Sequence, residues 1–213
     1  MRIEAFNWQN EDNPTCDLPD YPMGIYQAVP VTIKEKNYVC GGGYPHTAHC
    51  FNLLSGEKAP FNLFHKRAYA SSVTTNDTVF IFGGSDGSGA LASYETINVD
   101  HVHSEGVLPF TWYSGCSTLI NSTTILLVGG YKNEKRTEET WFFNIETKEW
   151  TQGPSMVENR NNFKARENFG CGLIKSINSV AAFGGYYPYT ATTEIVKLPG
   201  GSFKPGNHQC SFD

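Results

Sequence analysis

The sequence lacks long apolar runs and has almost no helical periodicity. In its 213 residues, no apolar stretch approaches the roughly 18 residues of a membrane-spanning helix. Residues 1–13 also lack the apolar core of a signal peptide. The chain as written is therefore expected to be soluble, without a membrane span or an export signal. We expect a cytoplasmic protein if Met1 is the true start, and an extracellular one if the chain is a fragment of a longer protein.

Charge of one sign is not concentrated anywhere, and the signatures of catalysis are missing. The formal net charge is −5, and the charged residues are scattered. Nucleic-acid binding needs a basic stripe, so that class of partner is not expected. No Gly-rich phosphate loop precedes a helix, and no Ser/His/Asp set can be assembled by spacing. The sequence therefore predicts neither a nucleotide enzyme nor a hydrolase.

Four short apolar runs, by contrast, each end at a Gly-Gly step. They occupy residues 38–43, 80–84, 125–130 and 180–185. Short apolar runs bounded by glycine and polar turns are typical of buried strands. The last glycines of successive runs are 41, 46 and 55 residues apart. A period of roughly 40–50 residues with several strands in each period indicates a propeller array.

The third run gives the fullest pattern. Within residues 115–156 an apolar strand, a Gly-Gly pair, a charged loop and a second strand follow in order, with Trp141 and Trp150 after the glycines. This order, repeated four times, resembles the kelch repeat family. The resemblance implies an all-β, kelch-type β-propeller of about four blades, each with four antiparallel strands, possibly as part of a larger propeller. Only the third repeat keeps both tryptophans, so the outer edges of the other blades are expected to be less regular.

The repeats divide the whole chain, which we treat as a single propeller domain. We expect an N-terminal partial blade or closing strand, then four repeats, then a tail. The partial blade or closing strand covers residues 1–20, and the tail covers residues 199–213. The four repeats cover residues 24–63, 67–109, 113–156 and 168–198.

The loops carry the predicted function. We call the four strands of a repeat a to d in chain order; in a propeller of this kind the b–c and d–a loops share one face. Variable loops on a rigid scaffold are where binding usually occurs, and Tyr and Arg favour interface hot spots. We therefore predict a non-enzymatic protein that binds a protein partner there. The residues expected to contact the partner are Tyr187, Tyr189, Arg160, Arg166, Lys132 and Arg136.

Some kelch-type propellers are copper oxidases or sugar-isomerising enzymes, which leaves one alternative open. It is an enzyme or sugar-binding propeller that acts on a small polar ligand at the loop face. His46, His49 and Cys50 form an H-x-x-H-C pattern, but a structural zinc site usually needs a second pair at suitable spacing. No metal and no cofactor are therefore expected. The identity of the partner and the oligomeric state are left open.

Cysteines and sequons complete the prediction. Cys40 and Cys50 flank one loop, and pairing of their strands in a hairpin would let them form a disulfide. Cys116 and Cys171 occupy matching places in neighbouring repeats, where we expect inert, buried thiols. Asn76 and Asn121 begin the two N-x-[ST] sequons of the turns before Gly-Gly strands. Each is a candidate glycosylation site, and the alternative is that asparagine serves there only as a turn residue.

Overall fold

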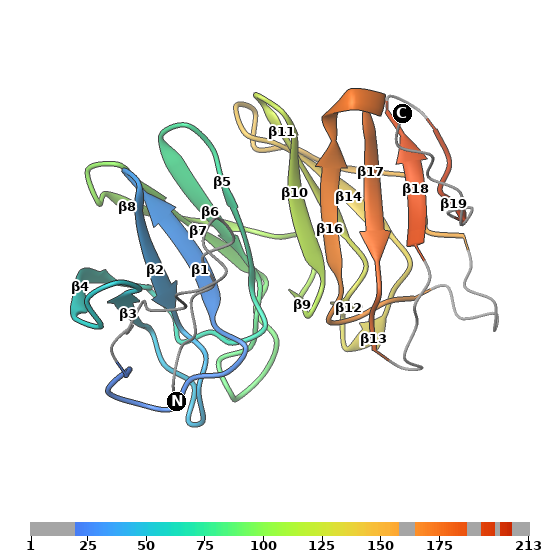
Figure 1. The fold of residues 1–213 in the computed structure, drawn as a ribbon. Helices are drawn as coiled ribbons and strands as arrows, with labels where there is room; N and C mark the ends of the chain where they lie inside the picture. The colour runs from blue at the N-terminus through green and yellow to red at the C-terminus, as the bar shows by residue number, and fades with distance from the viewer. Residues whose placement is uncertain (1–19, 158–164, 187–192, 199–200, 206–213) are drawn as a thin grey trace, which may run out of the picture. The chain divides into compact units, whose positions relative to one another are not determined.

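The structure, a computed structural model, describes residues 20–157, 165–186, 193–198 and 201–205. The chain forms two compact units (Figure 1). Unit 1 comprises residues 1–89 and 94–106, and unit 2 comprises residues 90–93 and 107–213. No helix among the described residues is long and apolar enough to span a membrane.

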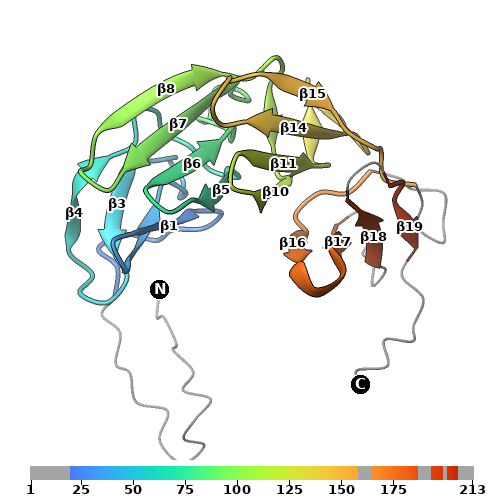
Figure 2. The same cartoon turned by 90° about the horizontal axis from the view of Figure 1, so that it is seen from above.

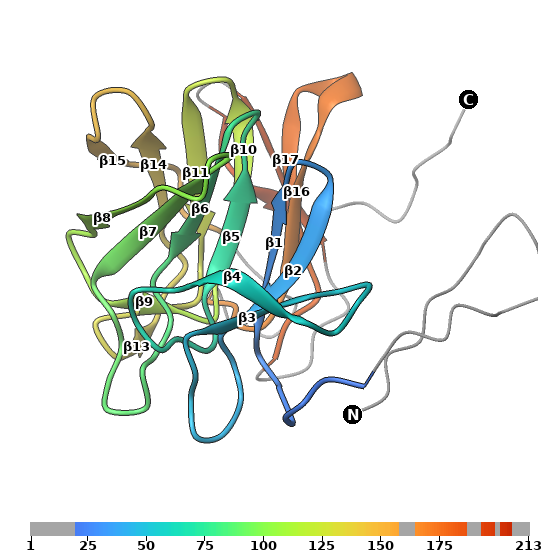
Figure 3. The ribbon, with the colours of Figure 1, turned by 90° about the vertical axis from the view of Figure 1, so that its left-hand side faces the viewer.

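The first sheet of unit 1 contains four antiparallel strands in chain order. Its strands are β1 (Val29–Ile33), β2 (Lys36–Cys40), β3 (His49–Asn52) and β4 (Lys58–Asn62) (Figure 3). Along β1 the side chains of Val29, Val31 and Ile33 are buried and those between them are exposed. This alternation follows from the period of two in a strand, and it turns one face of the sheet toward the core.

The second sheet of unit 1 repeats that order. Its strands are β5 (Ser71–Thr74), β6 (Thr78–Phe82), β7 (Ser93–Asn98) and β8 (His103–Val107). In β6 four consecutive side chains, from Val79 to Phe82, are buried, so this inner strand is covered on both faces. Val79, Ile81 and Ile97 pack with Val31 and Phe61 of the first sheet in one apolar core.

Unit 2 contains two more four-stranded antiparallel sheets (Figure 2). The third sheet of the chain is formed by β10 (Cys116–Asn121), β11 (Thr124–Val128), β14 (Thr140–Asn144) and β15 (Trp150–Gln152). The fourth is formed by β16 (Gly170–Ile174), β17 (Ser179–Phe183), β18 (Thr193–Lys197) and β19 (Lys204–Pro205), with a 3-10 turn, η1 (Lys175–Ile177), between β16 and β17. Their shared core contains Leu126, Val128, Val180, Val196 and Phe203.

Unit 2 also contains a small additional sheet, which lies at the Gly-Gly end of β11. It pairs β12 (Tyr131–Lys132) with both β9 (Trp112–Tyr113) and β13 (Lys135–Arg136). The turn between β12 and β13 has positive φ at Asn133 (50°) and Glu134 (63°), as a two-residue hairpin turn requires. This sheet holds the side chains of β9, β12 and β13 in place at that end of the third repeat.

Glycine is required at the Gly-Gly step because another backbone lies against it. A Cβ added at Gly130, where φ is +82°, would lie 2.5 Å from the nitrogen of Gly115 and 2.6 Å from the oxygen of Tyr113. The Gly130 N–H donates to the Arg166 carbonyl at 2.7 Å, and in unit 1 the Gly42 N–H donates to the Arg67 carbonyl at the same distance. Within each unit, the glycine pair of one sheet therefore binds the segment that leads into the next.

The predicted fold class is confirmed: the described chain is all-β and its main sheets are four-stranded and antiparallel, consistent with a kelch-type propeller. Among the described residues no sheet closes on itself. The predicted N-terminal strand, residues 1–19, lies outside the described residues. The last strand, β19, lies beyond the predicted fourth repeat, in the segment expected to be a tail. The repeat boundaries themselves remain a prediction.

Candidate functional site

Two tyrosines form the centre of the candidate site in unit 2. Tyr113 of β9 is the register partner of Tyr131 of β12. Because paired residues of adjacent strands project to the same side, their rings stack, with centroids 4.7 Å apart and planes 8° from parallel. In unit 2 this stack lies at the end of the third sheet opposite the β10–β11 turn (Figure 1).

Arg136 and Glu167 complete a four-residue group with the two tyrosines, here called the tyrosine–arginine cluster. The Arg136 guanidinium lies 5.3 Å from the centre of the Tyr131 ring. Its Nε donates to Oε1 of Glu167 at 2.9 Å. The Arg136 side chain is 35% exposed and that of Glu167 only 7%. A buried carboxylate therefore orients a guanidinium whose outer edge is open to solvent.

The two phenols remain protonated well above neutral pH. Burial, the carboxylates of Glu134 and Glu167, and the neighbouring Tyr131 together raise the pKa of Tyr113 to about 12. Burial raises the pKa of Tyr131 as well, supported by its hydrogen bond to Glu167 and opposed by Arg136. A neutral phenol offers an apolar ring together with a hydroxyl that can donate or accept. At physiological pH, the cluster thus presents aromatic surface, hydroxyl groups and one cation.

Lys132, also predicted to meet a partner, is engaged within unit 2. Its ammonium pairs with the Glu139 carboxylate and lies 4.8 Å from the Trp141 ring centre and 5.2 Å from that of Phe110. Burial acts to raise the pKa of Glu139, but the hydrogen bonds from Lys132 and Trp141 outweigh it and lower that pKa. Lys132 is only 21% exposed, so Arg136 presents more of its side chain to solvent.

Arg166 corrects a prediction, because it is not a surface residue. Its side chain is 1% exposed, and its Nε and Nη2 donate to Oε1 of Glu194 at 3.1 and 2.9 Å. Its Nη1 donates to the Gly184 carbonyl at 2.8 Å. Glu194 itself is fully buried. The guanidinium therefore joins β18 to the glycine pair of the fourth sheet, and a partner could not reach it.

Unit 1 contains the same device. The fully buried pair of Arg67 and Glu95 joins β7 to the Gly83 carbonyl. For the third sheet, Trp112 of β9 takes the place that arginine has in the second and fourth sheets, and its Nε1 donates to the Gly129 carbonyl at 2.8 Å. Both arginines precede their glutamate by 28 residues. That recurrence was the signal in the sequence that could have identified Arg166 as structural.

Unit 1 has an aromatic group of its own beside the glycine pairs. The rings of Tyr26 and Tyr69 meet edge to face at 6.3 Å, and His46 lies 6.4 Å from Tyr69. Burial, followed by the interaction with Tyr26, raises the pKa of Tyr69. Tyr44 is 86% exposed. The residues predicted from the sequence to contact a partner did not include Tyr26, Tyr69, Tyr113 or Tyr131.

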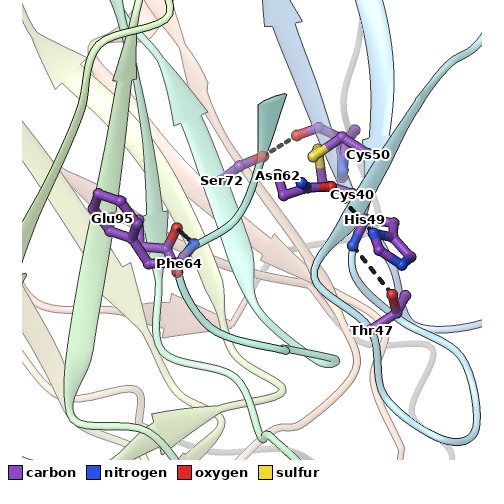
Figure 4. The surroundings of a disulfide bond; sticks show 9 residues. Cys40, Thr47, His49, Cys50, Asn62, Phe64, Ser72 and Glu95 are labelled. Atoms are coloured by element: carbon purple, nitrogen blue, oxygen red, sulfur yellow. Dashed lines mark hydrogen bonds between the residues drawn. A yellow bond between two sulfur atoms is a disulfide. The ribbon is translucent and has the colours of Figure 1, made fainter. Parts of the chain in front are cut away.

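Two disulfides join cysteines within the described part of the chain. The β2–β3 register pairs Cys40 with Cys50, and their sulfurs are 2.02 Å apart (Figure 4). Cys116 of β10 and Cys171 of β16 are also joined, with an S–S distance of 2.11 Å. The expectation of inert thiols at Cys116 and Cys171 was therefore wrong, because equivalent strands of neighbouring sheets lie side by side and bring equivalent residues together.

Other predicted residues can be placed briefly. Arg160, Tyr187 and Tyr189 lie outside the described residues. The ring of His49 contacts the Asn62 side chain at 3.1 Å. Across the part of the chain that the structure describes, no group of three or more His, Cys, Asp or Glu side chains could hold a metal ion.

Comparison with known proteins gives one match. Residues 113–157 match the family model described as the Kelch motif, which supports a kelch-repeat family for this chain. The matched segment runs from Tyr113 through β15 and thus contains Tyr131 and Arg136 of the cluster. No curated protein matches the chain.

Proposed function

We propose that this chain, a kelch-repeat protein, is a non-enzymatic binding protein that takes a protein partner at its b–c and d–a loops. The observation that carries the proposal is the tyrosine–arginine cluster. Its members come from two d–a connections, one with Tyr113 and the other with Glu167, and from one b–c loop, with Tyr131 and Arg136. These are the two kinds of loop in which the repeat pattern places binding.

The chemistry of the cluster suits a protein surface. Tyrosine and arginine are enriched at the energetic centres of protein interfaces. A tyrosine supplies a large contact area while losing little conformational freedom. The stack with Tyr113 holds Tyr131, and Glu167 holds Arg136. Side chains that are already ordered lose less entropy on binding, so the cluster is preorganised for association.

Four further residues predicted from the sequence are kept in the proposal. Lys132 is the neighbour of Tyr131, and Arg160, Tyr187 and Tyr189 belong to the adjoining d–a and b–c connections of the same unit. We keep these four as proposed contact residues, together with Arg136, and leave out the buried Arg166.

The test is quantitative capture with matched variants. Tagged full-length chain, as wild type, Arg136→Ala or Lys175→Ala, is used to capture proteins from cells that express it, and each candidate is then titrated in purified form. Lys175 is an exposed residue of η1, at the opposite end of the fourth sheet from its glycine pair. Arg136→Ala should weaken binding by about 30-fold, equivalent to about 2 kcal/mol, while Lys175→Ala should leave it unchanged.

Two outcomes would overturn the proposal. Partners that bind Arg136→Ala as tightly as wild type would show that the cluster is not the binding site. A sugar or divalent metal that raises the melting temperature as RT ln(1 + [L]/Kd) requires would favour the small-ligand alternative. Circular dichroism of Arg136→Ala, compared with wild type, separates lost binding from lost folding.

A further inference from the structure

Oxidised cysteines and exposed sequons occur together in this chain. We propose that the protein folds in an oxidising compartment of the secretory pathway and carries N-linked glycans at Asn76 and Asn121. The proposal concerns modification and compartment, and it does not depend on the binding role of the loops.

The disulfides support the oxidising compartment. Every cysteine in the described residues is paired, in Cys40–Cys50 and Cys116–Cys171. One bond lies within a sheet and the other links two neighbouring sheets, so the pairs arise from independent parts of the fold. Cytosolic thiols are kept reduced, and structural disulfides accumulate in secreted and extracellular proteins. Two unrelated cysteine pairs at bonding distance therefore indicate an oxidising environment.

Asn76 lies on an exposed hairpin turn of unit 1. Thr75 and Thr78 close the turn, since the Thr75 N–H donates to the Thr78 carbonyl at 2.9 Å, and Asn76 and Asp77 are its two exposed residues. Among the described residues, none forms a hydrogen bond with the Asn76 side chain, and the strands on either side of the turn are regular. A bulky, solubilising group attached here would extend into solvent without disturbing the β5–β6 ladder.

Asn121 lies at the corresponding turn of the third sheet, displaced by one position. It is the last residue of β10 and pairs with Thr124, so the turn residues are Ser122 and Thr123. Its side-chain oxygen accepts from the Thr123 N–H at 2.9 Å and from the Thr123 hydroxyl at 3.2 Å. The residue is exposed, and no other described residue forms a hydrogen bond with its carboxamide nitrogen, the atom that a glycan modifies.

The position of Asn121 keeps its glycan away from the candidate binding surface. Asn121 precedes β11, and Tyr131 follows the glycine pair after β11. The five residues of β11 span roughly 17 Å at about 3.3 Å per residue. Within unit 2 the sugar and the tyrosine–arginine cluster thus lie at opposite ends of one sheet, so modification and binding are compatible.

The competing explanation is that asparagine is present only as a turn residue. It accounts for the hydrogen bonds of Asn121 with Thr123, because Asn side chains commonly bond to the backbone two residues later. It does not account for the hydroxyl residue two positions after Asn76, because the Thr78 hydroxyl forms no hydrogen bond with another described residue. It also makes no prediction about cysteine oxidation, so experiment can separate the two explanations.

The first experiment uses the native protein. The chain is purified from cells that express it naturally, alkylated without reduction, and digested. Half of the digest is treated with peptide N-glycosidase in heavy-oxygen water, which converts a glycosylated Asn to a labelled Asp. We expect label at both Asn76 and Asn121, and peptides linked through Cys40–Cys50 and through Cys116–Cys171. Alkylated, unlinked cysteines would refute the proposal of an oxidising compartment. An asparagine without label would refute the proposal that this asparagine is glycosylated.

The second experiment uses variants expressed in the same cells. Thr78→Ala and Thr123→Ala destroy one sequon each, whereas Asp77→Ala and Ser122→Ala alter the same turns and leave the sequons intact. Each of the first pair should lose one glycosidase-sensitive step in electrophoretic mobility, and the second pair should migrate as wild type. Equal migration of all four variants, before and after glycosidase, would show that neither turn is modified.

Discussion

Replacing Arg166 with alanine should be among the most damaging single changes in unit 2. The substitution removes the guanidinium that compensates the fully buried Glu194 carboxylate. Glu194 also accepts a hydrogen bond from the Val157 N–H at 2.8 Å, which the variant would keep. The Gly184 carbonyl would lose its donor as well. The variant therefore leaves one charge and one backbone acceptor poorly satisfied inside the protein.

The expected magnitude follows from the burial of both partners. Breaking a buried ion pair from one side costs about 3–5 kcal/mol, because the remaining charge is left uncompensated. Folded domains are stable by only about 5–15 kcal/mol in total. Replacing both partners by apolar residues, Arg166→Met with Glu194→Leu, removes the stranded charge. We therefore expect the double variant to be more stable than Arg166→Ala, although both lack the ion pair.

Urea unfolding followed by tryptophan fluorescence is the appropriate assay. Three of the four tryptophans, Trp112, Trp141 and Trp150, lie in unit 2, so fluorescence reports mainly on that unit. Lys175→Ala, at an exposed position of η1, serves as the control and should change the free energy of unfolding by less than about 0.5 kcal/mol. Comparison of midpoints is valid where the slope against urea concentration is unchanged.

The reasoning would be refuted by a small loss. If Arg166→Ala lowered the free energy of unfolding by less than about 1 kcal/mol, as exposed ion pairs do, the pair would not be isolated from water. A double variant that is less stable than Arg166→Ala would also contradict the argument, since the stranded carboxylate would then not be the main cost.

Two further predictions concern the third repeat. Gly130→Val should lower the free energy of unfolding of unit 2 by several kcal/mol, because φ is +82° and a Cβ would meet backbone atoms at 2.5 to 2.7 Å. The control is Gly172→Ala, because nothing lies within 4 Å of the Cβ added there. Equal melting curves for the two variants would contradict the prediction. Tyr113 should ionise with a midpoint near its raised pKa of about 12, as seen in the difference in tyrosinate absorbance between wild type and Tyr113→Phe. Because the pKa of Tyr113 in the folded protein lies above the unfolded value of about 10, the stability tied to this proton is complete below pH 10 and is lost as pH rises through 12. Tyr113→Phe should therefore reduce the loss of stability at alkaline pH. An ionisation midpoint of Tyr113 near 10 would refute this prediction.

The strands were predictable because their signal is local. The apolar run at residues 125–128 and the glycines after it mark β11 and its end without reference to any other segment. The four-fold repetition of that pattern predicted four sheets, and the sheets have the expected antiparallel order. Hydrophobic period and turn chemistry determine where a strand begins and ends, and both can be observed within a few residues.

The roles of individual side chains were less predictable because they depend on contacts distant in sequence. Arg166 lies in a polar, charged segment that is typical of exposed loops, yet its partner Glu194 is 28 residues away. Cys116 and Cys171 are equivalent residues of adjacent sheets, and their bond depends on how the first strands of those sheets pack. Tyr113 joins the candidate site through its pairing with Tyr131. Each of these required the tertiary structure.

The Cys116–Cys171 bond gives unit 2 a closed covalent loop. The two cysteines are 55 positions apart in the sequence, and the segment between them includes every strand of the third sheet after the start of β10, and also the hairpin that carries Tyr131 and Arg136. Closing a loop of this length removes chain entropy from the unfolded state worth about 4 kcal/mol. A peptide bond cut anywhere inside the loop would leave its two halves attached. Tyr131, Arg136 and Glu167 of the tyrosine–arginine cluster are therefore carried on a segment that a single proteolytic cut inside the loop cannot release.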